Sequence, residues 1–405
     1  MVSNIFKVRF KLPSGDIIRC GIAGVIENTR KQVDSVEFAY HKDYLSKVKH
    51  PIDPSTLHLT SDVFKLYCDK STPGFIDDIL PDSWGKKVLS RIHNIPYPST
   101  SDLLKVMEYS TVGALHFSSE DSSDISFGLG CNINDLLELQ SIAKKIDLGT
   151  LTDKEIEQYK LAMFARGSSI GGARPKVLVH DDDKAYIAKF AKDGDKFDYA
   201  TVEHACLKLM EMAGLSVAQT TIEHVNEESA LLVERFDVIQ NHGRYHQITA
   251  NALLKSPDNQ SDPFIASYDD IVKLISLYSC RPLEDKQQLF GQMLFNRALN
   301  NTDDHLRNFS FTCKENGWQL SPAYDVVPSM TYGSYHQLKL GYDDMLPSIH
   351  EAIRHFKKFG LTQHQAEIVI DNVKSVLLKW KLVFENYGVS TVDIENIAKV
   401  IKIDK

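Results

Sequence analysis

The stretch "NTDDHLRNFSF", residues 301–311, places two aspartates, a histidine, an arginine and an asparagine directly after an apolar segment with helical spacing. Such a concentration of donors and acceptors fits a metal site, a catalytic loop or a polar turn. The "DDH" triplet alone does not separate these alternatives, because aspartate and histidine serve in all three. The residues around the stretch have to decide between them.

Asp303 and Asn308 are five positions apart, which is the D-x-x-x-x-N spacing of a phosphoryl-transfer loop. In that chemistry the aspartate accepts the proton of an acceptor hydroxyl, and the amide oxygen binds Mg²⁺. Magnesium needs a second hard oxygen ligand, and Asp325 in "SPAYDVVPS" offers one 17 residues after Asn308. The three residues predict a magnesium-dependent phosphotransferase.

Four upstream features occur in the order that this chemistry requires. Lys189 ends a predicted strand and could reach nucleotide phosphates, and Glu203 could hold it by an ion pair. The glycine-bearing "GSSIGGARPK" (167–176) supplies backbone N–H groups for phosphates, and "VERFD" (233–237) would be the hinge beside the adenine. Taken singly, each has an ordinary alternative as a turn, a strand end or a helix-surface charge, and His305 could be a loop brace.

The chain is long enough for several domains, and we predict three parts: residues 1–120, 121–237 and 238–405. The first part opens with two strands, "FKVRFKL" (6–12) and "IIRCGIAGVI" (17–26). It continues with helical text around "SWGKKVLSRI" (83–92) and ends in the polar stretch at 118–128.

The middle part contains a capping box, "TDKE" at 152–155, which predicts the start of a helix. "KVLVH" (176–180) and "AYIAKF" (185–190) flank a polar turn and predict a strand pair. "TVEHACLKLMEMAGL" (201–215) predicts a helix that stops at Gly214.

The last part is mainly helical, with one predicted β-pair formed by "NFSFT" (308–312) and "GWQLSP" (317–322). The predicted helices cover residues 268–278, 283–301, 365–388 and 392–403. The predicted fold class is α+β, a bilobal protein-kinase-like fold. Its small mixed N-terminal lobe carries an extra N-terminal subdomain, and its C-terminal lobe is mainly α-helical.

Composition limits the binding partners, the metal sites and the cellular compartments that we expect for the protein. A net charge of −8 argues against a surface that binds nucleic acid over its whole extent. The six cysteines form no C-x-x-C pair, which excludes the usual zinc spacings and suggests reduced thiols. No apolar run approaches the roughly 18 residues of a membrane span, so we expect a soluble, cytoplasmic protein with no membrane association.

At this point the residues resemble a known family, the HipA-type serine/threonine kinases, which are toxins of bacterial type II toxin–antitoxin modules. The resemblance covers nearly the whole chain. It rests on "FIDDILPDSWGKKVL" (75–89), "STVGALHF" (110–117), "SIGGARPK" (169–176), "ALLVERFD" (230–237), "TDDHLRNFS" (302–310) and "LSPAYDVVPS" (320–329).

The resemblance implies roles for individual residues. Asp303 would be the catalytic base, and Asn308 with Asp325 would bind Mg²⁺. Ser169, or Ser168 beside it, would be autophosphorylated, which ejects the glycine loop and silences the kinase. The implied ATP-binding residues are Ser169, Gly171, Gly172, Ala173, Lys176, Lys189, Glu203, Glu234, Phe236, His305 and Asn308, with Glu234 and Phe236 acting through their backbone.

Two departures from the family pattern bear on the site. Arg174-Pro175 stands where other members often carry Gln-Glu, so the phosphate contacts of this loop are expected to differ. Asp304 replaces a common small residue and adds negative charge beside the base.

The resemblance also implies partners: a helix-turn-helix, HipB-like antitoxin, operator DNA reached mainly through that antitoxin, and a protein substrate. The implied substrate is an aminoacyl-tRNA synthetase, such as glutamyl-tRNA synthetase, whose modification would stall translation and arrest growth. Two other functions stay open on the residues alone. One is a nucleotide-binding corepressor without kinase activity, and the other is a small-molecule or lipid kinase of the same fold.

Overall fold

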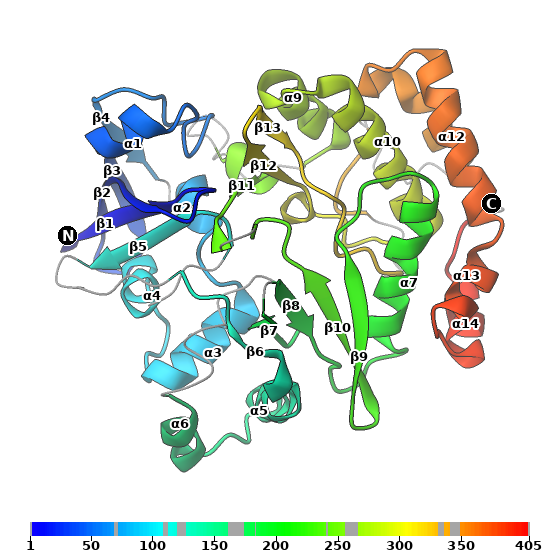
Figure 1. Ribbon diagram of the computed structural model, residues 1–405, viewed down its shortest axis with the longest axis horizontal. Helices are drawn as coiled ribbons and strands as arrows, with labels where there is room; N and C mark the ends of the chain where they lie inside the picture. Colours follow the sequence, from blue (N-terminus) through cyan, green and yellow to red (C-terminus); the bar gives the residue numbers. More distant parts are fainter. Residues whose placement is uncertain are drawn as a thin grey trace. The chain divides into compact units, whose positions relative to one another are not determined.

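The chain forms two compact units. Figure 1 shows the helices and strands of the computed structural model as a ribbon. Unit 1 comprises Met1–Lys192, Val225–Glu227 and Glu234–Asp262, and unit 2 comprises Asp193–His224, Glu228–Val233 and Pro263–Lys405. The structure describes residues 2–68, 72–107, 112–119, 127–160, 174–182, 184–239, 242–255, 266–330, 336–340 and 349–403.

Unit 1 begins with an antiparallel sheet in the order β4-β3-β2-β1-β5. Phe6, Val8 and Phe10 alternate along β1, and each is buried because one face of the sheet covers the core. The two strands predicted at the N-terminus are confirmed. The strands are β1 Val2–Lys11, β2 Ile17–Glu27, β3 Val33–Tyr40, β4 Val63–Tyr67 and β5 Leu115–Ser119.

The helices of unit 1 include the two that the sequence predicts. The capping box is confirmed at the start of α6, since the Thr152 N–H donates to Glu155 at 2.9 Å and the Glu155 N–H donates to the Thr152 hydroxyl at 3.3 Å. The helices are α1 Lys42–Lys47, α2 Gly74–Asp77, α3 Ser83–His93, α4 Thr100–Val106, α5 Leu136–Leu148, α6 Asp153–Lys160 and α8 Ala250–Leu253.

The predicted hairpin is confirmed as β7 Lys176–His180 paired antiparallel with β8 Ala185–Lys189. Lys176 lies directly opposite Lys189 in this register. β6 Cys131–Asn132 lies parallel to β7, and unit 1 also holds β11 His246–Thr249.

Unit 2 is built around α10, whose residues 289–298 are all buried. A methyl group at Gly291 would lie 2.7 Å from a Leu215 side-chain carbon, so glycine lets α10 pack closely against that segment. The Gly214 stop (φ 82°) and the β12–β13 pair are confirmed. The elements are α7 Tyr199–Met212, β9 Thr220–Val225, β10 Glu228–Glu234, α9 Tyr268–Tyr278, α10 Pro282–Ala298, β12 Ser310–Lys314, β13 Gly317–Leu320 and α11 Ile349–Arg354.

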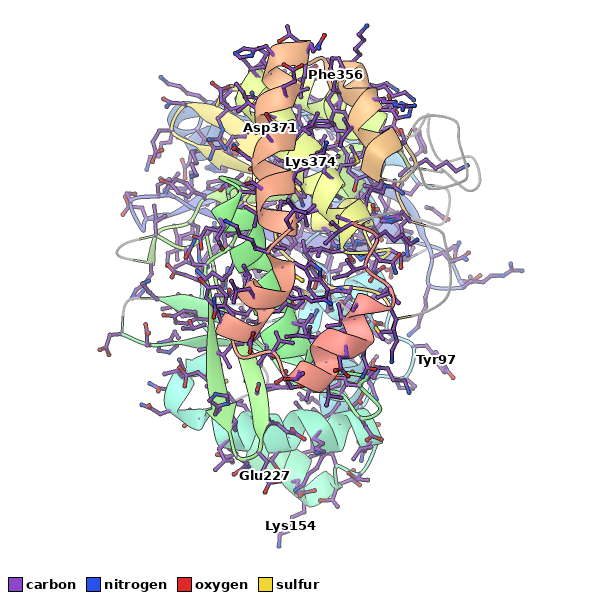
Figure 2. The ribbon with its side chains drawn as sticks, turned by 90° about the vertical axis from the view of Figure 1, so that its right-hand side faces the viewer. Tyr97, Lys154, Glu227, Phe356, Asp371 and Lys374 are labelled. Carbon is purple, nitrogen blue, oxygen red and sulfur yellow. The ribbon has the colours of Figure 1, made fainter. Side chains whose placement is uncertain are left out.

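The C-terminal helices differ from the prediction in one respect. The helix expected over 365–388 is broken into α12 Gln363–Leu377 and α13 Trp380–Asn386, followed by α14 Thr391–Ala398. The break lies at Lys379 (φ −108°, ψ 9°), and the buried residues keep helical spacing across it, so periodicity could not reveal it. Asp371 and Lys374 are exposed on α12 (Figure 2).

None of the helices in the described ranges combines the length and the apolar character that a membrane span requires.

Candidate functional site

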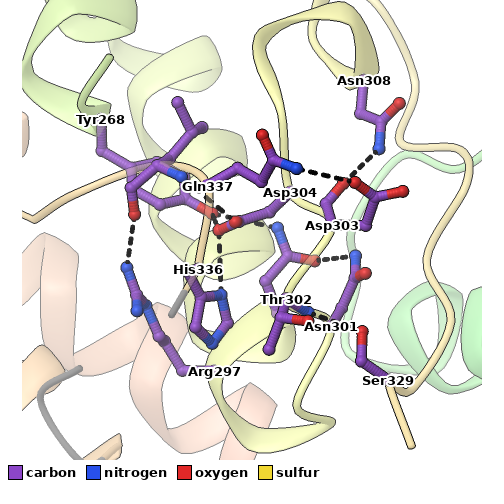
Figure 3. Close-up of polar contacts among 12 residues, drawn as sticks. Tyr268, Arg297, Asn301, Thr302, Asp303, Asp304, Asn308, Ser329, His336 and Gln337 are labelled. Atoms are coloured by element: carbon purple, nitrogen blue, oxygen red, sulfur yellow. Dashed lines mark hydrogen bonds and ion pairs between the residues drawn. The ribbon is translucent and has the colours of Figure 1, made fainter. Parts of the chain in front are cut away.

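The segment quoted first leaves α10 through a tight backbone turn. α10 ends at Ala298, and Asn300 follows with a left-handed backbone (φ 56°). The Asn300 side chain donates to the Ser329 carbonyl at 2.9 Å, the Ser329 N–H donates back to the Asn300 carbonyl at 2.9 Å, and the Thr302 N–H donates to the Ser329 hydroxyl at 3.2 Å. The loop is therefore fixed to the segment that carries Asp325 (Figure 3).

Asp303 and Asn308 meet across a turn that ends in a short 3-10 helix, Leu306–Asn308. The buried Asn308 donates its Nδ2 hydrogen to the backbone carbonyl of Asp303 at 3.0 Å. The Asp303 carboxylate reaches solvent, and its Oδ1 accepts a hydrogen bond of 3.2 Å from Gln337 Nε2 (Figure 3). The D-x-x-x-x-N spacing thus closes a turn in which the Asn308 side chain is hydrogen-bonded to the backbone of Asp303.

Asp325 lies close enough to act on the Asp303 carboxylate electrostatically. Partial burial raises the pKa of Asp303; the charges of Asp325 and Asp304 raise it further, while His305 and Gln337 act in the opposite direction. Asp325 itself has a left-handed backbone (φ 58°), a conformation that aspartate tolerates better than most residues. The structure therefore brings Asp303, Asn308 and Asp325 together; their chemical roles stay predictions.

The donor set suits Mg²⁺ bound together with phosphate. The carbonyl oxygen Oδ1 is the atom of the Asn308 amide that can bind a cation, and the hydrogen bond from Nδ2 to the Asp303 carbonyl fixes the orientation of this amide. Asp325 adds a half-buried carboxylate. The described residues contain no group of three or more His, Cys, Asp or Glu side chains arranged for a metal ion. Magnesium is commonly held by one or two protein oxygens and completed by substrate phosphates and water, which is what this loop offers.

Asp304 points inward, away from the solvent-facing side of the loop. Its side chain is completely buried; Oδ2 accepts hydrogen bonds from the Tyr268 hydroxyl at 2.8 Å and from His336 Nδ1 at 3.1 Å. Oδ1 accepts from the Leu338 N–H at 3.3 Å. The expected negative charge beside the base is therefore present, and the same carboxylate also ties three segments of unit 2 together.

Arg297 lies behind this buried carboxylate. Its Nη2 donates to the Leu338 carbonyl at 2.9 Å, and its guanidinium lies 5.9 Å from the centre of the Tyr268 ring. Burial lowers the pKa of His336, and it does so despite the Asp304 charge. A neutral His336 donates from Nδ1 to Asp304, and the positive charge of Arg297 interacts favourably with the same carboxylate.

The predicted residues of unit 1 fall into two groups. Ser168, Ser169, Gly171, Gly172 and Ala173 lie outside the described residues. Lys176 and Lys189 face each other across the β7–β8 ladder, as described above.

The predicted hinge also belongs to unit 1. The Glu234 side chain binds Lys184 at 2.8 Å, which is compatible with the predicted nucleotide contact through the Glu234 backbone; the contact of Phe236 stays a prediction. Arg235 and Asp237 form a buried ion pair of 2.6 Å, and the Gly113 N–H donates to Asp237 at 2.7 Å. Two motifs that are 124 residues apart therefore meet at one carboxylate.

A third charged residue completes this cluster. Arg244 Nη1 lies 3.6 Å from Asp237, and burial lowers the pKa of Arg244 to about 9. Burial alone would raise the pKa of Asp237, but Arg235, Arg244 and the Gly113 N–H together hold it below its usual value. Sequence reasoning missed Arg244, because no motif marks it.

Glu203 is buried in α7 of unit 2, while Lys189 belongs to unit 1. The Glu203 charge helps to raise the pKa of Cys206, one turn further along the helix. The ion pair between Lys189 and Glu203 stays a prediction.

Comparison with known proteins places this arrangement in a family context. Residues 168–380 match the model of the HipA-like C-terminal domain, and residues 18–118 match that of the HipA N-terminal domain. A putative kinase of Haemophilus influenzae is 28% identical over 188 residues, covering 41% of this chain and 54% of that protein. The serine/threonine-protein kinase toxin HipA of Shewanella oneidensis is 25% identical over 300 residues, covering 67% of this chain and 66% of that protein. The matches thus span between about half and two thirds of these relatives' length.

Among solved structures, the complex of HipA, HipB and operator DNA from Shewanella oneidensis MR-1 has a similar fold. The TM-score is 0.67 at 19% sequence identity, covering 98% of this chain and 94% of that chain. This likeness, together with the observed mixture of helices and sheets, confirms the predicted α+β fold class. The predicted boundaries near residues 120 and 237 stay predictions.

Proposed function

This chain belongs to the HipA family, and we propose that it is an ATP- and Mg²⁺-dependent serine/threonine protein kinase that acts as the toxin of a toxin–antitoxin pair. One observation carries the proposal. The Asp303 carboxylate is exposed and lies within electrostatic range of Asp325, while Asn308 is hydrogen-bonded to the same turn. A base and two hard oxygen ligands on two segments that hydrogen bonds hold together are what phosphoryl transfer to a hydroxyl requires.

In this proposal Asp303 orients the serine or threonine hydroxyl of the substrate and takes its proton. Asn308 and Asp325 would hold a magnesium ion, which would supply charge neutralisation at the phosphates. The fixed loop contributes positioning, because its hydrogen bonds to Ser329 and Asn308 exist before substrate arrives. Positioning and electrostatics supply most of the acceleration in this chemistry.

On the nucleotide side, Lys189 and Lys176 would neutralise ATP phosphates; their opposite positions in the β7–β8 register support this proposal. The backbone of Glu234 and Phe236 would meet the adenine. The remaining proposed contacts come from Ser169, Gly171, Gly172, Ala173, Glu203, His305 and Asn308.

Incubation of the purified chain with γ-labelled ATP and a bacterial lysate, followed by phosphosite mapping, tests the activity and identifies the substrate. We expect magnesium-dependent label on serine or threonine of a small number of proteins. ATP binding without transfer would favour the corepressor function instead, and label on a metabolite or lipid would favour a small-molecule kinase.

As the pH is lowered, the kinase activity should begin to fall at a higher pH than it would if the base were an aspartate with an ordinary pKa. The raised pKa of Asp303 means that protonation begins above the usual value of about 3.9, and the protonated form cannot accept the substrate proton. The pH dependence of kcat/KM for ATP, measured at saturating Mg²⁺, should therefore show an acid limb above that value. A rate that stays constant down to pH 4 would contradict Asp303 as the base.

We propose Ser169 as the site of self-inhibitory autophosphorylation. A phosphate there adds about −1.5 to −2 charge to a loop that would otherwise bind ATP phosphates. Ser169→Ala should abolish self-labelling and keep the kinase active after preincubation with ATP, and Ser168→Ala is the matched control. Mass spectrometry of both variants decides between the two serines; label lost only from Ser168→Ala would move the site by one residue.

The proposed partners follow from the family. They are a HipB-like helix-turn-helix antitoxin, operator DNA bound mainly through that antitoxin, and an aminoacyl-tRNA synthetase as substrate, with the cytoplasm as the location. The similarity in fold to the HipA component of a HipA–HipB–operator DNA complex supports the first two. The net charge of −8 supports an indirect route to DNA, because a chain of that charge is repelled by phosphates. Mobility shifts of operator DNA with and without the antitoxin test this route.

A further inference from the structure

Gln337 touches the Asp303 carboxylate directly, although no sequence motif points to it. Its Nε2 donates to Oδ1 at 3.2 Å, and Figure 3 shows the amide directed at the loop. Oδ2 of Asp303 accepts no hydrogen bond from any residue that the structure describes. We propose that Gln337 is a positioning residue that holds one oxygen of the Asp303 carboxylate so that the other faces the acceptor hydroxyl. This inference rests on the proposed kinase function.

The backbone of Gln337 is itself anchored to the catalytic loop. Its N–H donates to the Thr302 carbonyl at 3.2 Å, one residue before the base. The next residue, Leu338, donates its N–H to Asp304 and accepts from Arg297 through its carbonyl. The main chain is therefore held at two consecutive residues, Gln337 and Leu338. These contacts fix the position from which the Gln337 side chain extends.

The neighbours of Gln337 explain why its side chain points outward. His336 and Leu338 are both buried, with His336 bonded to Asp304, whereas Gln337 is exposed. This alternation is that of an extended chain with one face toward the core. The two buried neighbours fix the orientation of the segment, and the residue between them is directed to the side on which Asp303 lies.

The Asp303 carboxylate needs such a contact to keep one orientation, because rotation about the last side-chain bond of aspartate (χ2) is only weakly restricted. Without a partner, either oxygen of Asp303 can face the substrate in a range of orientations. A hydrogen bond from a neutral amide restricts the torsion and leaves the charge in place. Gln337 therefore has the chemistry of an orienting group and not of an acid or base.

Kinetics of the wild type, Gln337→Ala and Gln337→Met test the inference. Gln337→Met keeps about the length of the side chain and adds no charge but removes the amide donor, so it separates hydrogen bonding from packing. We expect kcat to fall about 10- to 100-fold in both variants, since small misplacements of reacting groups cost that much. KM for ATP should stay within about twofold, because the interaction matters only when the proton is transferred.

The matched control is Gln363→Ala, which removes a 2.8 Å hydrogen bond of the same type, from a glutamine amide to Glu367, on the surface of α12. Wild-type kcat in either Gln337 variant, or an equal loss in Gln363→Ala, would overturn the inference. A wild-type chain that transfers no more phosphate than Asp303→Asn would overturn the proposed function, and the positioning role with it. The inference is supported if the wild type and Gln363→Ala are active while both Gln337 variants are slow.

Discussion

Asp303→Asn should lose phosphate transfer by about 10²- to 10⁴-fold while the protein stays folded. The magnitude is that of a positioned general base, because the amide cannot accept the substrate proton. The substitution keeps the shape of the side chain and the 3.2 Å contact with Gln337. Initial rates of transfer from γ-labelled ATP, at equal protein concentration, measure the effect.

The same substitution should not reduce stability. The raised pKa of Asp303 shows that the folded protein disfavours the ionised carboxylate, so a neutral amide removes an unfavourable charge. The melting temperature should be equal to that of the wild type or higher. Asp371→Asn, at an exposed position of α12, is the control and should leave both rate and stability unchanged. Transfer at the wild-type rate in Asp303→Asn would place the base elsewhere.

Asp237→Ala should lower the free energy of unfolding by about 3–5 kcal/mol. The substitution removes the only carboxylate bonded to Arg235 among the described residues and leaves Arg235 and Arg244 as buried, uncompensated cations. The Gly113 N–H loses its acceptor as well. Urea denaturation followed by tryptophan fluorescence measures the difference. Glu37→Ala, which removes an exposed 3.4 Å contact with Lys65, is the control and should cost less than about 1 kcal/mol.

The contribution of Asp237 should also depend on pH. A carboxyl whose pKa is lowered by folding stabilises the protein above the unfolded value of about 3.9 and loses that contribution as the pH falls toward the folded value. The stability difference between wild type and Asp237→Ala should therefore be constant near neutrality and shrink below about pH 4. A difference below about 1 kcal/mol at neutral pH would mean that the cluster is held by packing alone.

Local patterns predicted much of this structure correctly. The capping box at Thr152, the β7–β8 hairpin and the stop at Gly214 each depend on residues only a few positions apart, so the sequence displays them directly. The meeting of Asp303 and Asn308 is of the same kind, because a five-residue spacing on one turn determines it.

Other features could not be predicted, because they depend on contacts between distant segments. The inward direction of Asp304 is set by Tyr268 and His336, which lie 36 and 32 residues away. Gln337 is 34 residues away from the base that it contacts, and the sequence around it is typical of an ordinary extended segment. Charge and spacing near the loop contain no signal for these partners, which become visible only when the chain is folded.

The discontinuity of unit 1 has a consequence for how the chain is made. Asp237, which binds Gly113 and Arg235, belongs to a segment that ends at Asp262, while the first segment of the unit ends at Lys192. About 70 residues (193–262) must be translated before the unit has all its parts, which takes about 4–14 s at ordinary rates of synthesis. For the first 45 of these residues (193–237) the emerging chain contains Gly113 without Asp237, the acceptor of its N–H. We therefore expect chaperones that bind nascent chains to be most useful to this protein before residue 262 has been synthesised.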